Sequence, residues 1–248
     1  MNKVSVLGIQ ISNLSSDELN QQILKCVASH RKSLVLNVNI HAMNMADKYP
    51  WFKQLLNSAE IVFCDGDGVR LGAKLLGVQI KEKITFNRWI WSFAEFSQTH
   101  GISWYCIGSN DKVIQASITK LETLFPSLII KGYRNGFFTT EKDSRRTVDD
   151  INSKKPDVIL LGMGMPLQEN WLLANWQSTE ATIALTGGAV FEYVSGTTKM
   201  TPNIFFKFKL EWFYRFVHEP RRLFKRYFIG NFWFMFRVLF TTIRGKKG

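Results

Sequence analysis

The sequence has few of the residues from which metal sites and disulfide frameworks are built. Its 248 residues include three cysteines and four histidines. Cys26, Cys64 and Cys106 are widely spaced and form no C-x-x-C pair, which argues against a zinc site and a disulfide framework. No Ser, His and Asp arrangement for nucleophilic catalysis can be assigned. His41 follows a predicted strand and could touch a substrate, although a lone histidine is more often structural.

Long hydrophobic runs are also missing. The longest apolar run, residues 228–240, is about 13 residues long and is interrupted by Arg237, whereas a spanning helix needs roughly 20. The first residues run directly into a strand-like segment and show no hydrophobic region followed by a small-residue cleavage site. Internal repeats and low-complexity stretches are absent. We therefore expect a cytoplasmic protein without a transmembrane helix.

The charge is distributed unevenly along the chain. Residues 199–248 contain 12 Lys and Arg but only two carboxylates, Glu211 and Glu219, whereas the preceding residues contain 20 basic and 18 acidic groups. The same segment contains 15 aromatic residues. Lys and Arg near an anionic leaflet contribute about 1 kcal/mol each, and aromatic rings settle at the headgroup level. This composition predicts a segment that lies on a membrane surface.

Two other interpretations of this segment stay open. Basic residues interleaved with aromatic ones also suit single-stranded nucleic acid, and an ordinary aromatic core with a solvated basic face has the same composition. We favour the membrane surface and expect no nucleic-acid partner. The change in composition near Gly196 predicts a boundary between a catalytic body, residues 1–196, and a C-terminal segment, residues 197–248.

Short apolar runs alternate with longer amphipathic ones through the body, which is typical of βα units around a parallel sheet. Ser15 and Glu18 form a capping-box pattern ahead of the first helix, and Pro166 suits the first turn of a later one. Residues 132–146 are polar and predict a loop leading into a helix. We predict strands at residues 4–9, 34–38, 60–64, 103–107, 128–131, 157–161 and 182–185.

Two carboxylates follow the third predicted strand. The sequence Asp65-Gly66-Asp67-Gly68 places them on a tight turn, where glycine lets a substrate approach the backbone closely. Ligands in open α/β sheets bind at the carboxyl ends of strands, which favours a catalytic or binding role for this turn. An Asp-X-Asp pair also resembles a metal site of nucleotide-sugar enzymes. The structural alternative is that Asp67 caps the following helix.

Two glycine-containing turns follow later strands. Gly162-Met163-Gly164 precedes Pro166 and exposes backbone amides before a helix, a setting that favours phosphate. Leu167 occupies the position of the third glycine in G-x-G-x-x-G, so a dinucleotide fingerprint is weakly supported. In the second turn, Gly187 and Gly188 precede Glu192, which could bind a ribose or simply favour the helix dipole.

Further segments complete an ordered series of motifs. Asn37 and Asn39 end the second predicted strand, and Gln168-Glu169 follows Pro166. The C-terminal segment contains Leu210-Glu211-Trp212-x-Tyr214-Arg215 and Glu219-Pro220-Arg221-Arg222-Leu223. In this order and spacing, the motifs resemble the WecG/TagA/CpsF family, which is glycosyltransferase family 26, over essentially the whole chain. The resemblance implies a Rossmann-like parallel sheet flanked by helices, with a basic, aromatic, helical C-terminal appendage.

Members of that family transfer a sugar from a UDP-activated donor to a polyprenyl-diphosphate-linked acceptor on the cytoplasmic membrane face, with inversion. The resemblance implies that Asp65 is the general base and that neither a metal nor a cofactor is needed. Gly-turn amides and arginines would then neutralise the leaving diphosphate. The substrate-binding residues implied by the match are Asn37, Asn39, Asp67, Lys83, Thr85, Gly162, Gly164, Pro166, Gln168, Glu169, Gly188, Glu192, Lys199, Arg215, Arg221 and Arg222.

The chain departs from the family pattern at several of these positions. Asn37 replaces a common threonine, Glu192 a usual aspartate, and Lys83 an arginine. Phe86 and Arg88 stand where glycine and aspartate normally follow. The departures leave the donor open among N-acetylmannosamine, glucose and a uronic acid. We expect a peripheral protein on the cytoplasmic face of the plasma membrane, and the sequence leaves self-association into a homo-oligomer open.

Overall fold

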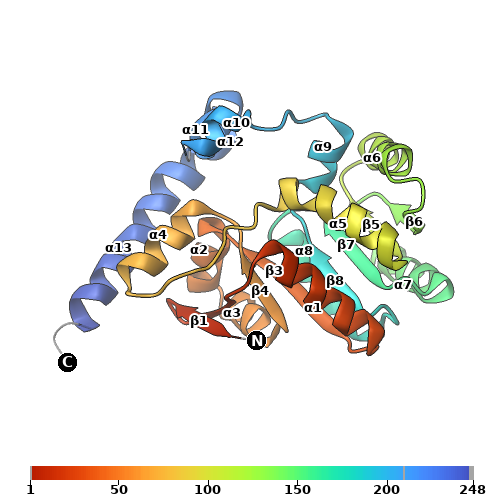
Figure 1. Ribbon diagram of the computed structural model, residues 1–248, viewed down its shortest axis with the longest axis horizontal. Helices are drawn as coiled ribbons and strands as arrows, with labels where there is room; N and C mark the ends of the chain where they lie inside the picture. Colours follow the sequence, from red (N-terminus) through yellow and green to blue (C-terminus); the bar gives the residue numbers. More distant parts are fainter. Residues whose placement is uncertain (1, 209, 246–248) are drawn as a thin grey trace.

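A computed structural model describes residues 2–208 and 210–245, except for the side chains of Phe206 and Arg222. Its centre is a six-stranded parallel sheet with the strand order β4-β3-β8-β7-β5-β6. Helices cover both faces of this sheet (Figure 1). This arrangement confirms the predicted α/β, Rossmann-like class. The strands are β3 (Ser33–Val38), β4 (Ile61–Cys64), β5 (Trp104–Gly108), β6 (Ile130–Arg134), β7 (Val158–Gly162) and β8 (Ile183–Thr186).

Two apolar cores, one on each face, hold the sheet. Successive residues of a strand point to opposite faces, so Val62 and Cys64 join one core while Ile61 and Phe63 join the other. Every residue of β4, β5, β7 and β8 is buried. Parallel strands covered on both faces need such continuous apolar runs, which is why these strands were recognisable in the sequence.

The prediction of the first strand is wrong, both in its secondary structure and in its position in the fold. Residues 4–9 do not make one strand of the parallel sheet but belong to an antiparallel hairpin of β1 (Lys3–Val6) and β2 (Ile9–Ser12). The chain reverses at Leu7 and Gly8, which both have positive φ, at 49° and 81°. Such two-residue turns match the twist of a hairpin. Leu7 hid the turn because leucine rarely adopts this conformation.

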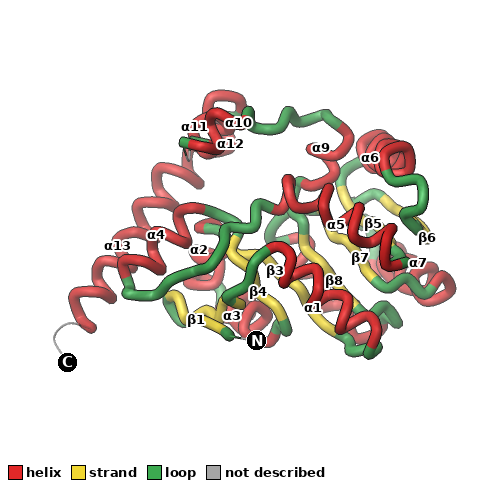
Figure 2. Tube along the Cα trace, viewed as in Figure 1, coloured by secondary structure: helices red, strands yellow, loops and turns green. Residues whose placement is uncertain are grey.

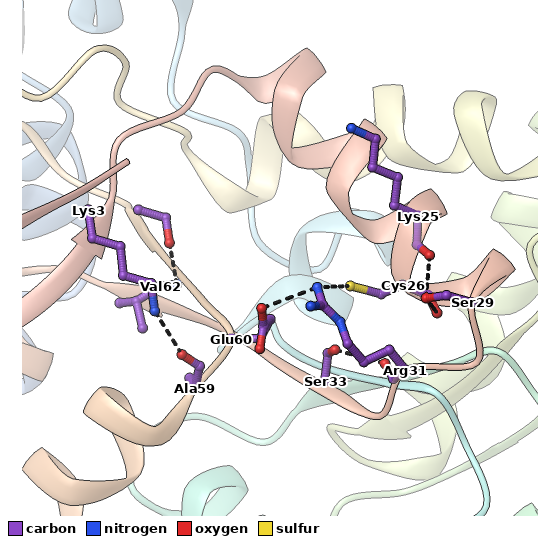
Figure 3. A network of polar contacts seen from close by, with 10 residues as sticks. Lys3, Lys25, Cys26, Ser29, Arg31, Ser33, Ala59, Glu60 and Val62 are labelled. Atoms are coloured by element: carbon purple, nitrogen blue, oxygen red, sulfur yellow. Dashed lines mark hydrogen bonds and ion pairs between the residues drawn. The ribbon is translucent and has the colours of Figure 1, made fainter. Parts of the chain in front are cut away.

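The hairpin lies against the edge of the main sheet. Ser12 Oγ accepts a hydrogen bond from the backbone N–H of Val62 in the edge strand β4 at 3.2 Å, and Lys3 Nζ donates to the carbonyl of Ala59 at 3.3 Å. Nearby, Arg31 bonds to Glu60 at 3.2 Å (Figure 3). These contacts cover the strand edge that precedes Asp65, and an uncovered edge would be open to pairing with another chain.

The body contains nine α-helices among the described residues. In α1, Ser15 Oγ accepts from the backbone of Glu18 and Glu18 accepts from the backbone of Ser15, so the predicted capping box is confirmed. The helix predicted at Pro166 begins one residue later. The helices are α1 (Ser16–Ala28), α2 (Ile40–Lys48), α3 (Pro50–Ser58), α4 (Asp67–Leu75), α5 (Phe86–His100), α6 (Asp111–Leu124), α7 (Glu141–Lys154), α8 (Leu167–Asn175) and α9 (Val190–Ser195), with a short 3-10 turn at Trp176–Ser178.

One predicted loop is partly a strand. Strand β6 extends to Arg134, three residues beyond the predicted end, and so enters the segment 132–146 that was expected to be a loop. Gly132 fits the strand because an added Cβ would lie 2.6 Å from the Tyr105 ring of neighbouring β5. The helix expected after the loop is present as α7.

The C-terminal segment is helical, as predicted. A loop after α9 leads to three short helices, and a long helix then runs beside α4 (Figures 1 and 2). The elements are α10 (Asn203–Lys207), α11 (Glu211–His218), α12 (Pro220–Phe224), a π-helical turn η2 (Lys225–Ile229) and α13 (Gly230–Gly245). In the described part of the chain, no helix combines the length and apolar character needed to cross a membrane.

Helix α13 joins the core of the body. Phe234 and Val238 are fully buried, and the Phe234 ring lies so close to Gly72 of α4 that an added Cβ would be 2.7 Å from it. Arg237 of α13 pairs with Asp47 of α2 at 2.8 Å. The predicted boundary near Gly196 stays a prediction, while the packing shows that α13 lies directly on the body.

Candidate active site

The motifs predicted from separate parts of the sequence meet at one edge of the sheet. Strands β4, β3, β8 and β7 are neighbours and parallel, so their carboxyl ends point the same way. Asp65 follows β4, Asn37 lies in β3, and Gly187-Gly188 and Gly162-x-Gly164 mark the ends of β8 and β7. The structure therefore brings these predicted residues together at the place where α/β sheets bind ligands.

Asp65 is fixed by hydrogen bonds at this edge. Its Oδ2 accepts from Asn37 Nδ2 at 3.0 Å, and its backbone N–H donates to the carbonyl of Val38 at 2.8 Å. Asn37 Oδ1 in turn accepts from the hydroxyl of Thr186 at 3.4 Å. The amide of Asn37 therefore holds one carboxylate oxygen of Asp65. Asp65 itself is half-buried.

The environment of Asp65 makes it a stronger base than an ordinary aspartate. Burial raises its pKa to about 6, because a charge is costly where protein replaces water. The Asn37 hydrogen bond and the positive charge of Arg215 oppose this shift, and the negative charge of Glu211 supports it. A carboxylate whose pKa lies near the working pH can both accept and release a proton, which is what general base catalysis requires.

Asp65 borders a pocket of about 1070 Å³. The pocket is enclosed by the ends of β3 and β4, by α4, by the start of α5, and by α11, η2 and α13 of the C-terminal segment. The segment thus supplies one wall of the site. Predicted residues that line the pocket are Asn39, Asp65, Asp67, Thr85 and Arg215.

The side chains of two of these lining residues, Asn39 and Thr85, differ in their hydrogen bonding. Asn39 caps α2, since its Oδ1 accepts from the backbone N–H of Ala42 at 3.1 Å. Thr85 precedes α5, and its buried hydroxyl has no hydrogen-bond partner among the described residues. Buried polar groups are normally satisfied, so an unpaired hydroxyl facing a pocket is available to a ligand.

Lys83 connects the body to the C-terminal segment. Its Nζ lies 2.8 Å from Asp67 Oδ2 and 2.7 Å from Glu211 Oε2, and its side chain is only 7% exposed. Burial alone would lower the pKa of Lys83, but the two carboxylates outweigh burial and raise it. The ammonium group therefore ties α11 to the start of α4. Lys83 does not itself line the pocket.

Arg215 brings a second charge from α11 to the site. Its guanidinium lies 5.9 Å from the ring centre of Tyr193, and its buried Nε has no hydrogen-bond partner among the described residues. Burial would lower the pKa of Arg215, yet Tyr193, Tyr227 and Asp65 raise it. Arg215 also lines a smaller cavity of about 240 Å³ with Glu192. An arginine between two cavities can reach an anion in either.

Gln168 and Glu169 are buried beneath the glycine turns and do not line the large pocket. Gln168 Oε1 accepts from the backbone N–H of Gly188 at 3.1 Å, and its Nε2 donates to Glu169 Oε1 at 2.8 Å. Burial raises the pKa of Glu169 to about 7, and its Oε2 has no partner among the described atoms. Both residues therefore support the turn at Gly188.

The predicted glycines differ in what surrounds them. Gly164 and Gly188 have positive φ, at 81° and 59°, and the space where a Cβ would lie is open. Gly162 instead packs against the Phe191 ring, 2.5 Å from an added Cβ. Open glycine turns let a ligand approach the backbone, whereas Gly162 lets α9 approach the sheet. Pro166 caps α8.

The remaining predicted residues lie away from the large pocket. Glu192 lines the smaller cavity, where its Oε2 has no partner among the described atoms. Lys199 and Arg221 are exposed and line neither cavity. The side chain of Arg222 lies outside the described residues.

The sequence interpretation missed several residues of the pocket wall. Arg70 and Lys74 follow the Asp65 turn at helical spacing, and Glu211 and Arg226 come from the C-terminal segment. His41, considered only as a weak candidate, also lines the pocket. Burial and the nearby charge of Arg226 lower the pKa of His41 to about 4, so it is neutral at physiological pH. The i, i+4 spacing of Arg70 and Lys74 was the one local signal available.

The described residues contain no group of three His, Cys, Asp or Glu side chains placed to hold a metal ion. Asp65 is bound by Asn37 and Asp67 by Lys83, so each carboxylate of the Asp-X-Asp pair has a protein partner of its own. That the reaction needs no metal stays a prediction.

Comparison with known proteins identifies the family of the chain. The profile of the glycosyl transferase WecG/TagA/CpsF family matches residues 4–248. An N-acetylglucosaminyldiphosphoundecaprenol N-acetyl-beta-D-mannosaminyltransferase of Staphylococcus aureus (strain MW2) is 24% identical over 223 residues, which cover 89% of this chain and 87% of the relative. A protein of the same name from Bacillus spizizenii is 26% identical over 212 residues, which cover 86% and 78%. With a family match across almost its full length, this chain belongs to the WecG/TagA/CpsF family of glycosyltransferases.

Proposed function

We propose that the chain transfers a hexose from a UDP-sugar to a polyprenyl-diphosphate-linked saccharide, with inversion, in the synthesis of a cell-envelope or extracellular polysaccharide. The observation that carries the proposal is the carboxylate of Asp65, which borders the large pocket and has a pKa of about 6. The names of the two relatives specify a lipid-diphosphate-linked acceptor and a β-linked product. Inversion yields a β-linkage from an α-linked nucleotide sugar.

In the proposed reaction, Asp65 takes the proton from an acceptor hydroxyl while the hydroxyl oxygen forms a bond to the anomeric carbon of the donor. The bond from that carbon to the diphosphate breaks, and UDP leaves with the electron pair on the opposite face. Asn37 keeps the carboxylate oriented through its 3.0 Å hydrogen bond. The protonated Asp65 then returns its proton to solvent, which restores the base.

The departing UDP carries negative charge that the site must stabilise. Arg215 is half-buried, and its buried Nε has no hydrogen-bond partner among the described residues, so it can supply charge-assisted hydrogen bonds. The open turns at Gly164 and Gly188 can supply backbone contacts, and the network of Gln168 and Glu169 keeps the second turn in place. We propose that these groups replace a divalent metal. N-acetylmannosamine is the donor sugar to test first, because both relatives are named for it.

We also propose that the protein works as a peripheral protein on the cytoplasmic face of the membrane. The supporting observation is the exposed apolar surface of the C-terminal segment, including Phe208 at 71%, Phe232 at 75% and Ile229 at 60% exposure. Such residues alternate with Lys and Arg, a combination suited to an anionic lipid surface.

Calorimetric titration of the full-length chain with UDP tests the proposal without an acceptor. We expect UDP to bind, and we expect NAD and a short RNA to bind at least tenfold more weakly. Gln168→Ala should weaken UDP binding because Gly188 loses its hydrogen-bond partner, whereas Gln115→Ala, on the exposed face of α6, should not. Preferential binding of NAD or RNA would refute the proposal.

A further inference from the structure

One face of α4 lines the large pocket along the whole helix. Asp67, Arg70, Leu71 and Lys74 all contribute to the wall, with the spacing of residues that share a helix face. The opposite residues Val69, Gly72 and Ala73 are buried against the body. Because a helix rises 1.5 Å per residue, Arg70 lies roughly 5 Å and Lys74 roughly 10 Å beyond Asp67 along the axis. The wall therefore changes from carboxylate to cation with increasing distance from Asp65.

The pocket carries an excess of positive charge. Its lining includes Arg70, Lys74, Lys81, Arg88, Arg215 and Arg226, against the carboxylates Asp65, Asp67 and Glu211. Asp67 and Glu211 share Lys83, whose single charge offsets one of the two carboxylates, and Lys81 is paired with Glu18 at 2.7 Å. Neither Arg70 nor Lys74 forms an ion pair with any carboxylate that the structure describes. Two cations one helical turn apart thus face the pocket without an anionic partner.

The strand order separates Arg70 and Lys74 from the glycine turns, which are assigned to the diphosphate of the donor. The glycine turns follow β8 and β7, whereas α4 follows β4, which lies at the sheet edge beyond β3. Asp65 precedes α4 directly, so the glycine turns lie across β3 from Asp65, whereas Arg70 and Lys74 lie further along α4 from it. A transferase with a diphosphate on both substrates needs two regions suited to phosphate.

The far end of α4 is apolar and exposed beside α13. Leu71 and Leu75 are 51% and 39% exposed, and Thr242 Oγ1 donates to the carbonyl of Leu75 at 3.3 Å. Phe234 packs on Gly72 and the later Thr242 bonds to the later Leu75, so the two helices run side by side in the same direction (Figure 1). Leu239 and Ile243 of α13 are also exposed, at 50% and 59%. An apolar seam thus continues from the cationic pair toward the surface.

We infer that Arg70 and Lys74 bind the lipid-linked diphosphate of the acceptor, and that its prenyl chain leaves along the seam between α4 and α13. This inference rests on the proposed function and identifies which part of the site takes which substrate. The order along α4 matches the chemical order of such an acceptor, with a sugar hydroxyl at Asp65, then the diphosphate, then hydrocarbon. Arg226 from η2 lines the facing wall of the same pocket.

The test uses the double substitution Arg70→Gln and Lys74→Gln in the full-length protein. A matched control is Lys142→Gln with Arg146→Gln, an exposed basic pair at the same i, i+4 spacing on α7, away from both cavities. The KM for a polyprenyl-diphosphate-linked N-acetylglucosamine acceptor should rise about 10- to 100-fold in the α4 variant, since charge-assisted contacts are lost. The KM for the donor and the Kd for UDP should stay within about twofold.

Binding of geranylgeranyl diphosphate provides a readout that needs no transfer. The α4 variant should lose at least tenfold affinity for it relative to the control, and geranylgeraniol and inorganic pyrophosphate should each bind the wild-type chain more weakly than the combined molecule. If wild-type protein transfers no sugar yet shows this pattern, the proposed function fails and the lipid-diphosphate site stands. If the α4 variant instead weakens UDP binding, or matches the control in both assays, the inference is overturned.

Discussion

The body and the C-terminal segment are held in place by different interactions. Buried apolar side chains on both faces of the sheet hold the body, whereas the described part of the C-terminal segment buries few large hydrophobic side chains, namely Leu223, Phe234 and Val238. Many other apolar residues of the segment remain exposed. Burial of a large apolar side chain contributes about 1.5–3 kcal/mol, so the body gains far more stability from apolar burial than the C-terminal segment does.

The segment is itself divided into two parts. Helix α13 is anchored by Phe234 in the core and by Arg237, which bonds to Asp47 and Asn44. Helix α11 is held mainly by polar contacts beside the pocket, above all the bridge from Lys83 to Glu211. The body therefore supplies most of the buried apolar core and the proposed catalytic base, while the polar part of the segment completes the pocket.

The largest effect should come from the body. Asp65→Asn removes the proposed base, and we expect the rate of sugar transfer to fall about 10²- to 10⁴-fold with the fold retained. Wild-type activity should rise with pH through about 6, the pKa of Asp65, because only the carboxylate can accept the proton. Initial rates measured between pH 5 and 8 check this rise in activity with pH. Asp17 is an exposed carboxylate of α1, and Asp17→Asn should leave the pH profile unchanged.

The same substitution should stabilise the protein at alkaline pH. The pKa of Asp65 is higher in the folded state, at about 6, than its ordinary value of 3.8, so the folded protein binds the proton more tightly. Stability is therefore lost as pH rises through this window, by up to about 3 kcal/mol. Asp65→Asn avoids this loss, and urea unfolding at pH 4 and pH 8 should show a gain only at pH 8. A loss of stability at both pH values would contradict the assigned cause.

The anchor of α13 should give the next largest effect. Phe234→Ala opens a cavity against Gly72, and we expect a loss of about 3–5 kcal/mol in the free energy of unfolding. Phe232 lies on the same helix, and its side chain is 75% exposed. Phe232→Ala should therefore change the free energy of unfolding by less than about 0.5 kcal/mol. Equal urea midpoints for the two variants would show that α13 is not part of the cooperative unit.

Much of the body was predictable because its signals are local. Strands such as Val158–Gly162 are continuous apolar runs, and Ser15 with Glu18 marks a helix start directly. The meeting of Asp65 with Asn37 followed from the rule that parallel strands end at one edge. The turn at Leu7 was missed because a leucine with positive φ has no sequence signature.

The other wall of the pocket was not predictable in the same way. Glu211 reaches Lys83 across 128 positions of sequence, and only tertiary packing sets that approach. The sequence predicts Gln168 as a substrate ligand, which stays a prediction, and only the structure reveals that Gln168 also holds Gly188. In a motif, a residue that contacts a ligand and one that supports the contact look the same.

A smaller effect should come from the exposed apolar residues of α13. Replacing Phe232 and Ile243 by serine should lower flotation with anionic liposomes about tenfold, because each side chain loses favourable transfer from water. Leu124→Ser with Ile129→Ser removes comparably exposed apolar residues from the body and should leave flotation unchanged. Equal loss in both double variants would mean that membrane binding does not depend on the C-terminal segment.

The smallest expected effect concerns the polar bridge. Glu211→Gln removes one partner of Lys83 and leaves Asp67 in place, so we expect a loss of stability of about 1 kcal/mol. Glu141→Gln, which breaks an exposed pair with Arg145, should cost less, since surface ion pairs contribute little. Glu211 also raises the pKa of Asp65, so its neutralisation should move the acid limb of the activity profile to lower pH. A loosened α11 would lower the rate of transfer without moving the acid limb of the activity profile. An unchanged acid limb would therefore show that α11 closes the pocket but does not raise the pKa of Asp65.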